Sequence, residues 1–252
     1  MSDPHSHYIY GLHTVQAVLQ REPESVSQLW VENSRRDEKV KKLLQLAYDA
    51  NIKPLRVSRD ELNKLVGETA NHQGVVAMSR ETPAGNEKDL RKLLENLTEP
   101  AFLLILDGVQ DPHNLGACLR TADAAGVNAV IAPKDKATGL TAVVRKVASG
   151  AAETVPFIQV TNLARTLREL QQAGIWLIGT SLETEQNLYQ ADLTGPLGLV
   201  LGAEGTGLRR LTAENCDLLV KLPMFGTVQS LNVSVSAGVC LYEAVRQRTV
   251  NK

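Results

Sequence analysis

The stretch FLLILDGVQDPHNLGACLRTADAAGVNAVIA, residues 102–132, sets the fold class of this chain. Its first apolar run, 102–106, reads as a buried strand, and the second run, 127–132, reads as another. Between them the segment 115–125 has a helical pattern that ends at Gly126. Near-continuous apolar strands joined through a helix predict parallel pairing in a sheet covered on both faces. The fold class is therefore α/β.

The same alternation continues to the end of the chain. Further strands are expected at 155–160, 175–180, 197–201 and 218–222, and further helices at 140–149, 163–173 and 231–249. In such folds ligands bind at the carboxyl ends of the strands. The loops that follow residues 106, 180, 201 and 222 are therefore the places to look for chemistry.

The first part of the chain is a smaller α/β unit. Strands are expected at 27–31, 52–57 and 74–78 and helices at 13–20 and 35–50, and Ser58 with Glu61 forms a capping box. Four of the 18 glycines precede residue 100, so close ligand contact is expected in the second part. We place the first domain at 1–79, a linker at 80–99 in which Asn86 caps a short helix, and the second domain at 100–252.

Composition excludes several classes of protein. The 252 residues carry a net charge of -1, so any nucleic-acid contact must come from a local basic patch. One candidate patch is Arg35, Arg36, Lys39, Lys41 and Lys42. The same five residues are equally explained as the solvated face of a helix. No apolar run approaches the roughly 18 residues that span a membrane, and the start is not a secretory signal. Three scattered cysteines lack metal-ligand spacing. We expect a cytoplasmic protein with no metal and no membrane partner.

Three loops carry residues suited to chemistry. The first, residues 107–126, opens a helix that Asp111 or Asn114 can cap, with Arg120 nearly two turns beyond Asn114. A helix cap and a surface arginine explain these residues equally well. His113 is a weaker candidate for a general base. The loop GAEGTGLRR, 202–210, has glycine spacing unlike a dinucleotide fingerprint and holds Glu204. The third, LPMFGTVQSLNVSVSAG at 222–238, leads through Asn232 into the last helix.

Taken together, these loops resemble the SpoU, or TrmH-like, RNA ribose 2′-O-methyltransferases of the SPOUT class. The resemblance rests on N-x-G-x-x-x-R from Asn114, L-G-x-E-G-x-G from Leu201, and P-M-x-G-x-x-x-S-L-N-V-S-V from Pro223, in this order. It covers about residues 100–250. The amino-terminal part is similar to the small L30e/L7Ae-like RNA-binding domain that precedes the catalytic domain in some members.

The resemblance implies a deep trefoil knot near the carboxyl end and S-adenosyl-L-methionine bound within it. The cofactor-binding residues would be Thr180, Gly202, Leu222, Met224 and Leu231. The catalytic residues would be Arg120, Asn114, Glu204 and Asn232. The family generally works as a homodimer with the last helix in the interface. An arginine is effectively never neutral, so we expect Arg120 to act as a cation, held by Glu204, rather than as a base.

The two-part arrangement is most like the bacterial enzymes that methylate a guanosine ribose in 23S ribosomal RNA. A transfer RNA 2′-O-methyltransferase of the same family and a non-catalytic RNA-binding assembly factor remain alternatives. A nucleotide-dependent oxidoreductase is disfavoured by the glycine spacing.

Overall fold

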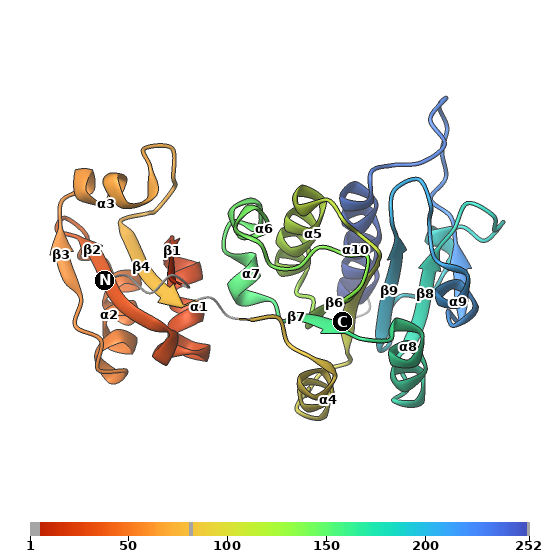
Figure 1. The fold of residues 1–252 in the computed structure, drawn as a ribbon, viewed down its shortest axis with the longest axis horizontal. Coiled ribbons are helices and arrows are strands. Elements are labelled where there is room, and N and C mark those ends of the chain that lie inside the picture. The colour runs from red at the N-terminus through yellow and green to blue at the C-terminus, as the bar shows by residue number, and fades with distance from the viewer. Residues whose placement is uncertain (1–5, 81–82, 251–252) are drawn as a thin grey trace. The chain divides into compact units, whose positions relative to one another are not determined.

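The computed structural model describes residues 6–80 and 83–250 and divides into two compact units between Pro83 and Ala84. Figure 1 shows the course of the chain through both units. Helix α4 (Glu87–Glu95), which falls in the segment expected to be a linker, belongs to the second unit. Its cap is the expected one, because Asn86 accepts a hydrogen bond from the amide of Lys88.

The first unit is a four-stranded sheet with three α-helices. Its elements are β1 (Ser6–Tyr10), α1 (Leu12–Arg21), the 3-10 turn η1 (Pro23–Ser25), β2 (Val26–Glu32), α2 (Glu38–Asp49), β3 (Leu55–Val57), α3 (Arg59–Val66) and β4 (Val75–Arg80). The strand order β1-β4-β2-β3 puts β3 at one edge of the sheet, in agreement with Pro54 just before it. The capping box of Ser58 and Glu61 at the start of α3 is confirmed.

Two features of the first unit differ from the sequence prediction. Strand β1 was missed, because SHYIY alternates too weakly to show its pairing with β4, far along the chain. Helix α2 begins at Glu38 rather than at residue 35, because Asp37 caps it and accepts a hydrogen bond from the amide of Val40.

The second unit is a three-layer α/β/α structure around a parallel sheet. Its elements after α4 are β5 (Phe102–Asp107), α5 (Pro112–Ala125), β6 (Ala129–Pro133), α6 (Ala142–Ala148), α7 (Ala151–Thr154), β7 (Phe157–Val160), α8 (Leu163–Gln172), β8 (Trp176–Thr180), the 3-10 turn η2 (Leu188–Gln190), β9 (Leu197–Gly202), α9 (Arg210–Glu214), β10 (Leu218–Val220) and α10 (Val233–Val250). The strand order is β10-β8-β9-β5-β6-β7, and every described pair is parallel.

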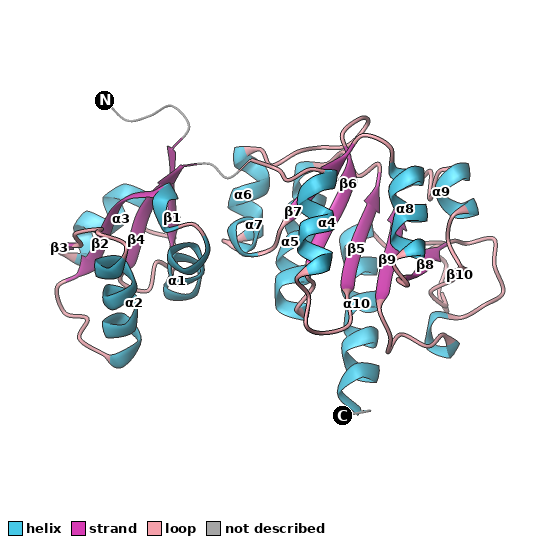
Figure 2. Cartoon of the chain, turned by 90° about the horizontal axis from the view of Figure 1, so that it is seen from below, coloured by secondary structure: helices cyan, strands magenta, loops and turns pink. Residues whose placement is uncertain are grey.

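The helices cover both faces of this sheet, as predicted (Figure 2). Helices α5, α6, α7 and α10 pack on one face around Leu104 and Leu106, and α4 and α8 pack on the other around Leu103 and Ile105. The alternation of β5 side chains between the two cores explains why the whole strand is apolar. The sheet is therefore a rigid base for the loops at its edge.

Three local differences lie in the second unit. The helix expected at 140–149 is α6, which ends where Ser149 and Gly150 adopt positive φ, and the four-residue helix α7 that follows was not predicted. The last helix begins at Val233, since Asn232 accepts hydrogen bonds from Ser234 instead of joining the helix. Helix α9 was not predicted, because five residues are too short for a periodic pattern.

Candidate functional site

The site lies at the carboxyl edge of the sheet, where four neighbouring strands end. Val220 pairs with Thr180, and Gly202 pairs with Asp107, so the ends of β10, β8, β9 and β5 form one continuous edge. The loops that follow these strands therefore meet in space although they are far apart in the sequence.

Asn232 connects the three loops singled out in the sequence. Its Nδ2 donates to Oδ1 of Asn114 at 2.9 Å and lies 3.4 Å from Oε2 of Glu204. Its Oδ1 accepts from the backbone amide of Ser234 at 2.9 Å and from the hydroxyl at 2.6 Å. Both ends of this amide are thus held, which fixes Asn232 where α10 begins. The structure brings three of the four expected catalytic residues together.

Arg120 is placed differently. It lies on α5 six residues after Asn114, about 9 Å further along the helix axis, and its side chain is exposed. Among the described residues Arg120 forms no hydrogen bond or ion pair, and Glu204 is joined to Asn232 rather than to it. The cap of α5 is Asp111, which accepts from the amide of His113, so Asn114 is left for other contacts. His113 is exposed at the start of the helix.

The glycine loop after β9 folds tightly back on the strand. The amide of Gly207 donates to the carbonyl of Ala203 at 2.9 Å, and a Cβ built on Gly202 would lie only 2.0 Å from the carbonyl carbon of Gly207. Gly205 and Gly207 also have positive φ. Only glycine at position 202 lets the loop approach the strand end this closely.

An ion pair between a buried carboxylate and a half-exposed arginine holds this loop in place, and the motifs in the sequence do not include it. Asp107, fully buried at the end of β5, accepts from the amide of Arg209 at 2.8 Å and from its Nε at 2.6 Å. The signal that points to it is a carboxylate directly after an apolar strand, where an unpaired charge would be costly. Asp107 therefore positions the loop that carries Glu204.

The five residues expected to bind the cofactor all lie along this edge. Thr180 and Gly202 end β8 and β9, while Leu222, Met224 and Leu231 lie in the loop between β10 and α10. All five are half-buried. The leucines and Met224 offer apolar contact, and Gly202 leaves the backbone at the end of β9 open to a ligand. These features suit a flat adenosine ring, which needs apolar contact and backbone hydrogen bonds. The residues present thus fit S-adenosylmethionine.

Two buried cysteines of the second unit keep their protons. Burial raises the pKa of Cys118 and of Cys240 to about 12, so neither thiol ionises near neutral pH. Within residues 6–80 and 83–250 no group of histidine, cysteine and acidic side chains is arranged to hold a metal ion. Helices long and apolar enough to cross a bilayer are also absent from these ranges.

Two residues of the basic segment 35–42 form ion pairs within the first unit. Arg35 is bound to Asp37 at 2.7 Å and to the carbonyl of Gln73, and Lys41 pairs with Glu38 at 2.5 Å on the same helix face. Both contacts favour the reading of a solvated helix face over that of a free cationic patch.

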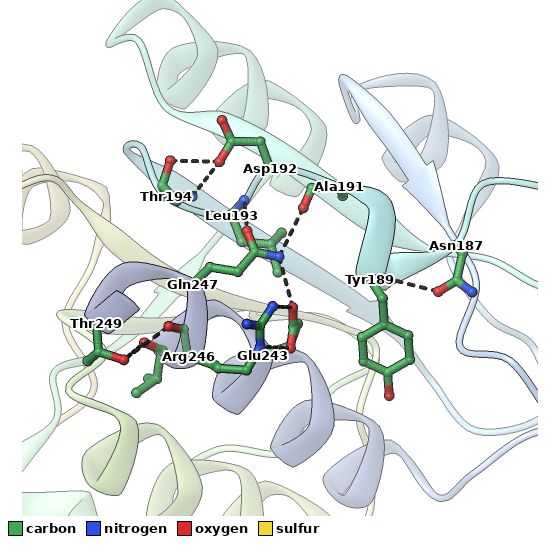
Figure 3. Close-up of polar contacts among 11 residues, drawn as sticks. Asn187, Tyr189, Ala191, Asp192, Leu193, Thr194, Glu243, Arg246, Gln247 and Thr249 are labelled. Atoms are coloured by element: carbon green, nitrogen blue, oxygen red, sulfur yellow. Dashed lines mark hydrogen bonds and ion pairs between the residues drawn. The ribbon is translucent and has the colours of Figure 1, made fainter. Parts of the chain in front are cut away.

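The segment that leads into β9 is clamped by α10 (Figure 3). Oε1 of Gln247 accepts from the amide of Leu193 at 2.9 Å, and its Nε2 donates to the carbonyl of Ala191 at 3.1 Å and to Glu243 at 2.9 Å. Arg246 forms two 2.8 Å bonds to Glu243 and holds the pKa of that carboxyl below its usual value. Helix α10 is thus fastened at its carboxyl end to the segment before β9.

Comparison with known proteins agrees with this geometry. Residues 101–242 match the model of the SpoU rRNA methylase family, and residues 8–83 match a model described as RNA 2′-O ribose methyltransferase substrate binding. The chain is 56% identical, over 97% of its length and 98% of the relative, to the 23S rRNA (guanosine-2′-O-)-methyltransferase RlmB of Pseudomonas putida.

Solved structures share the fold over nearly the whole chain. An RNA 2′-O ribose methyltransferase aligns with a TM-score of 0.65 at 28% identity, covering 97% of this chain and 90% of the other. The SpoU methyltransferase AviRb of Streptomyces viridochromogenes, solved with AdoMet, aligns with a TM-score of 0.71 at 24% identity, covering 98% and 92%. At that identity the second likeness concerns the fold alone.

Proposed function

The chain belongs to the SpoU rRNA methylase family, and from this premise we propose that it methylates the ribose 2′-oxygen of a guanosine in 23S ribosomal RNA, with S-adenosylmethionine as the methyl donor. The observation that carries the proposal is the meeting of Asn114, Glu204 and Asn232 beside the strand ends where the expected cofactor residues lie. The amino-terminal unit binds the RNA substrate, which its match to the substrate-binding model supports.

The protein's main task in this reaction is to hold the reacting groups. S-adenosylmethionine, when bound, supplies a methyl group on a positively charged sulfonium, so the leaving group is neutral. Thr180, Gly202, Leu222, Met224 and Leu231 hold its adenosine part by backbone groups and apolar contact. The largest reduction of the activation barrier is expected from holding the ribose oxygen in line with that methyl group.

The asparagine pair orients the ribose. Asn114 accepts from Asn232 through Oδ1, which leaves its Nδ2 without a partner among the described residues and able to donate to a ribose oxygen. Glu204 keeps the Asn232 amide turned toward Asn114. The asparagine pair would thereby hold the 2′-hydroxyl in the orientation that attack on the donor's methyl group requires.

Arg120 supplies positive charge. Its guanidinium stays protonated, grips a phosphate of the target nucleotide and stabilises the charge that develops on the 2′-oxygen. The proton of the hydroxyl leaves to water or to a phosphate oxygen of the RNA. The exposed position of Arg120 on α5 leaves it free for this contact.

The enzyme acts as a homodimer in the cytoplasm. Helix α10 packs on α5 and exposes Val235 and Tyr242, each about half exposed (51%), seven residues apart on one face. A second copy that covers this stripe removes apolar surface from water. Light scattering is expected to give twice the monomer mass. The three free thiols and the ribosomal substrate support a cytoplasmic location.

The test is methyl transfer from labelled S-adenosylmethionine to 23S ribosomal RNA, with transfer RNA as a second substrate. We expect a single 2′-O-methylated guanosine in 23S RNA and none in transfer RNA. Labelling of transfer RNA alone, or RNA binding without transfer, would replace the proposal with one of the other readings.

The variant Arg120→Lys tests the mechanism. We expect kcat to fall at least tenfold while RNA affinity changes little, because an ammonium lacks the forked, planar donor set. A turnover near that of the unaltered enzyme would contradict a role for the guanidinium.

A further inference from the structure

Phe225 is the most exposed large apolar side chain in the described chain. The exposed fraction of its side chain is 96%, and that of Val228 in the same loop is 61%. A full aromatic ring in water gains nothing for the folded monomer, because burial of its surface is what makes such a ring stabilising. We therefore look for a binding partner outside the monomer that covers this ring.

The position of Phe225 indicates which occupant. It directly follows Met224, expected to contact the cofactor, and the loop then runs to Asn232 of the asparagine pair. Figure 1 shows the connection between β10 and α10 projecting beyond the ends of β8 and β9. The loop that carries Phe225 thus leaves the same edge of the sheet as the loops that carry Glu204 and Asn114.

The loop that carries the ring is lightly held. Among the described residues, no backbone-to-backbone hydrogen bond involves residues 222–231, and every side chain from Phe225 to Ser230 is exposed. Its neighbours Thr227, Gln229 and Ser230 are polar but uncharged, so they do not repel a polyanion. Such a segment can adjust the plane of an aromatic ring to a partner.

We propose that Phe225 stacks on an unpaired base of the RNA beside the target ribose, a contact that rests on the proposed function and extends it. An enzyme that reaches a ribose within a folded RNA needs its nucleotide splayed out of the stack. An aromatic face replaces the lost base stacking for any base, because every base has a π-face. Phe225 is then a positioning residue that holds the opened loop while Asn114 and Arg120 engage the sugar and phosphate.

The test compares Phe225→Ala, Phe225→Leu and Phe225→Trp with the unaltered enzyme. We expect the alanine variant to raise KM for a 23S fragment by about 5- to 150-fold with a much smaller change in kcat. Leucine keeps the apolar character but not the π-face, so it should resemble alanine. Tryptophan should restore KM, and its fluorescence should be quenched when RNA is added.

Trp176→Ala is the matched control, because Trp176 is half exposed (50%) at the opposite, amino end of β8. It should leave KM for RNA unchanged. S-adenosylhomocysteine affinity, by calorimetry, and oligomeric state, by light scattering, are measured on every variant.

The outcomes separate the possible occupants of the ring. Unchanged RNA affinity in Phe225→Ala would overturn the proposal. An equal loss of RNA affinity and of S-adenosylhomocysteine affinity would also overturn it, because the ring would then contact the cofactor. Loss of RNA affinity together with dissociation to monomers would overturn it too, because the ring would then contact a second copy of the chain. RNA affinity of each variant is also measured by filter binding without the methyl donor. Absence of methyl transfer by the unaltered enzyme therefore concerns the proposed function and leaves this test intact.

Discussion

At the scale of single residues, Gly202 shows how the absence of a side chain builds the site. The loop after β9 returns so closely that a Cβ at this position would overlap the backbone of Gly207. Backbone atoms cannot move aside as the end of a flexible side chain does. Gly202 thus allows both the loop closure and the approach of a ligand to the strand end.

The variant Gly202→Ala is expected to lose S-adenosylhomocysteine binding by at least tenfold, because the loop that carries Glu204 must move away. The measurement is isothermal titration calorimetry. Gly195→Ala is the matched control, since a Cβ there meets nothing within 4 Å, and it should bind as the unaltered protein does. Normal binding by Gly202→Ala would show that the loop tolerates displacement.

His72 of the first unit is a second residue whose role follows from its surroundings. Its Nδ1 accepts from the amide of Gly74 at 3.0 Å, and its Nε2 lies 3.0 Å from Oδ1 of Asn63 on α3. Burial, with a smaller contribution from the charge of Arg59, lowers its pKa below the usual value near 6.5. The neutral ring therefore ties α3 to the turn before β4.

This shift predicts a pH dependence of stability. Because the folded pKa of His72 is lower than the unfolded value, the unfolded chain binds a proton first as pH falls. The contribution to the free energy of unfolding is therefore full above about pH 7 and is lost as pH falls through 6.5 and then through the folded pKa. Urea unfolding followed by Trp30 fluorescence measures it, and His72→Gln should be less stable but show a flatter slope between pH 7 and 5. Equal slopes in the two proteins would contradict this assignment.

At the scale of elements, α10 owes its position to contacts at both ends. Asn232 joins it to α5 and to the glycine loop, while Gln247 and Arg248 hold the segment before β9. The guanidinium of Arg248 also stacks over the ring of Phe102 at 4.3 Å. Helix α10 thus contacts β5 through Arg248 at one end and the loops of the site through Asn232 at the other.

Gln247→Ala is expected to lower the free energy of unfolding of the second unit by about 1–3 kcal/mol, because the buried amide of Leu193 and the carbonyl of Ala191 lose their partner. Urea unfolding followed by Trp176 fluorescence measures the change. Gln190→Ala is the control, as Gln190 is exposed on η2 and its side chain has no described hydrogen bond. An equal effect of the two variants would show that the clamp contributes nothing specific.

At the scale of the whole molecule, the chain consists of two units with separate hydrophobic cores. The first core lies between the sheet and α1 and α2, and the second unit has one core on each face of its own sheet. Each unit also contains one of the two tryptophans, Trp30 and Trp176. Separate cores permit separate unfolding of the two units.

We therefore expect S-adenosylhomocysteine to stabilise only the second unit. At a hundredfold excess over its Kd the added stability is about 2.7 kcal/mol for the state that binds it. Thermal unfolding of Trp30→Phe and Trp176→Phe, each with one tryptophan left, reports the units separately at one protein concentration. An equal shift in both would show that the units unfold together.

The sequence by itself determined the α/β class, the parallel sheet, the longer helices and the caps at Ser58 and Asn86. These features depend on residues close along the chain: the apolar runs at 102–106 and 197–201, the capping box of Ser58, and the glycine after α5. The motifs likewise identified the family, because their residue types and order are readable without coordinates. The knot implied by the resemblance stays a prediction.

Tertiary structure alone decided which of these residues meet. Asn232 and Asn114 are 118 positions apart, and Arg209 and Asp107 are 102 apart, so no local pattern could pair them. The pairing of β1 with β4 and the bond of Glu204 to Asn232 instead of Arg120 were decided in the same way. Local propensity acts over a few residues, whereas the strand order β10-β8-β9-β5 brings distant strand ends to one edge, and the chemistry of this protein depends on that edge.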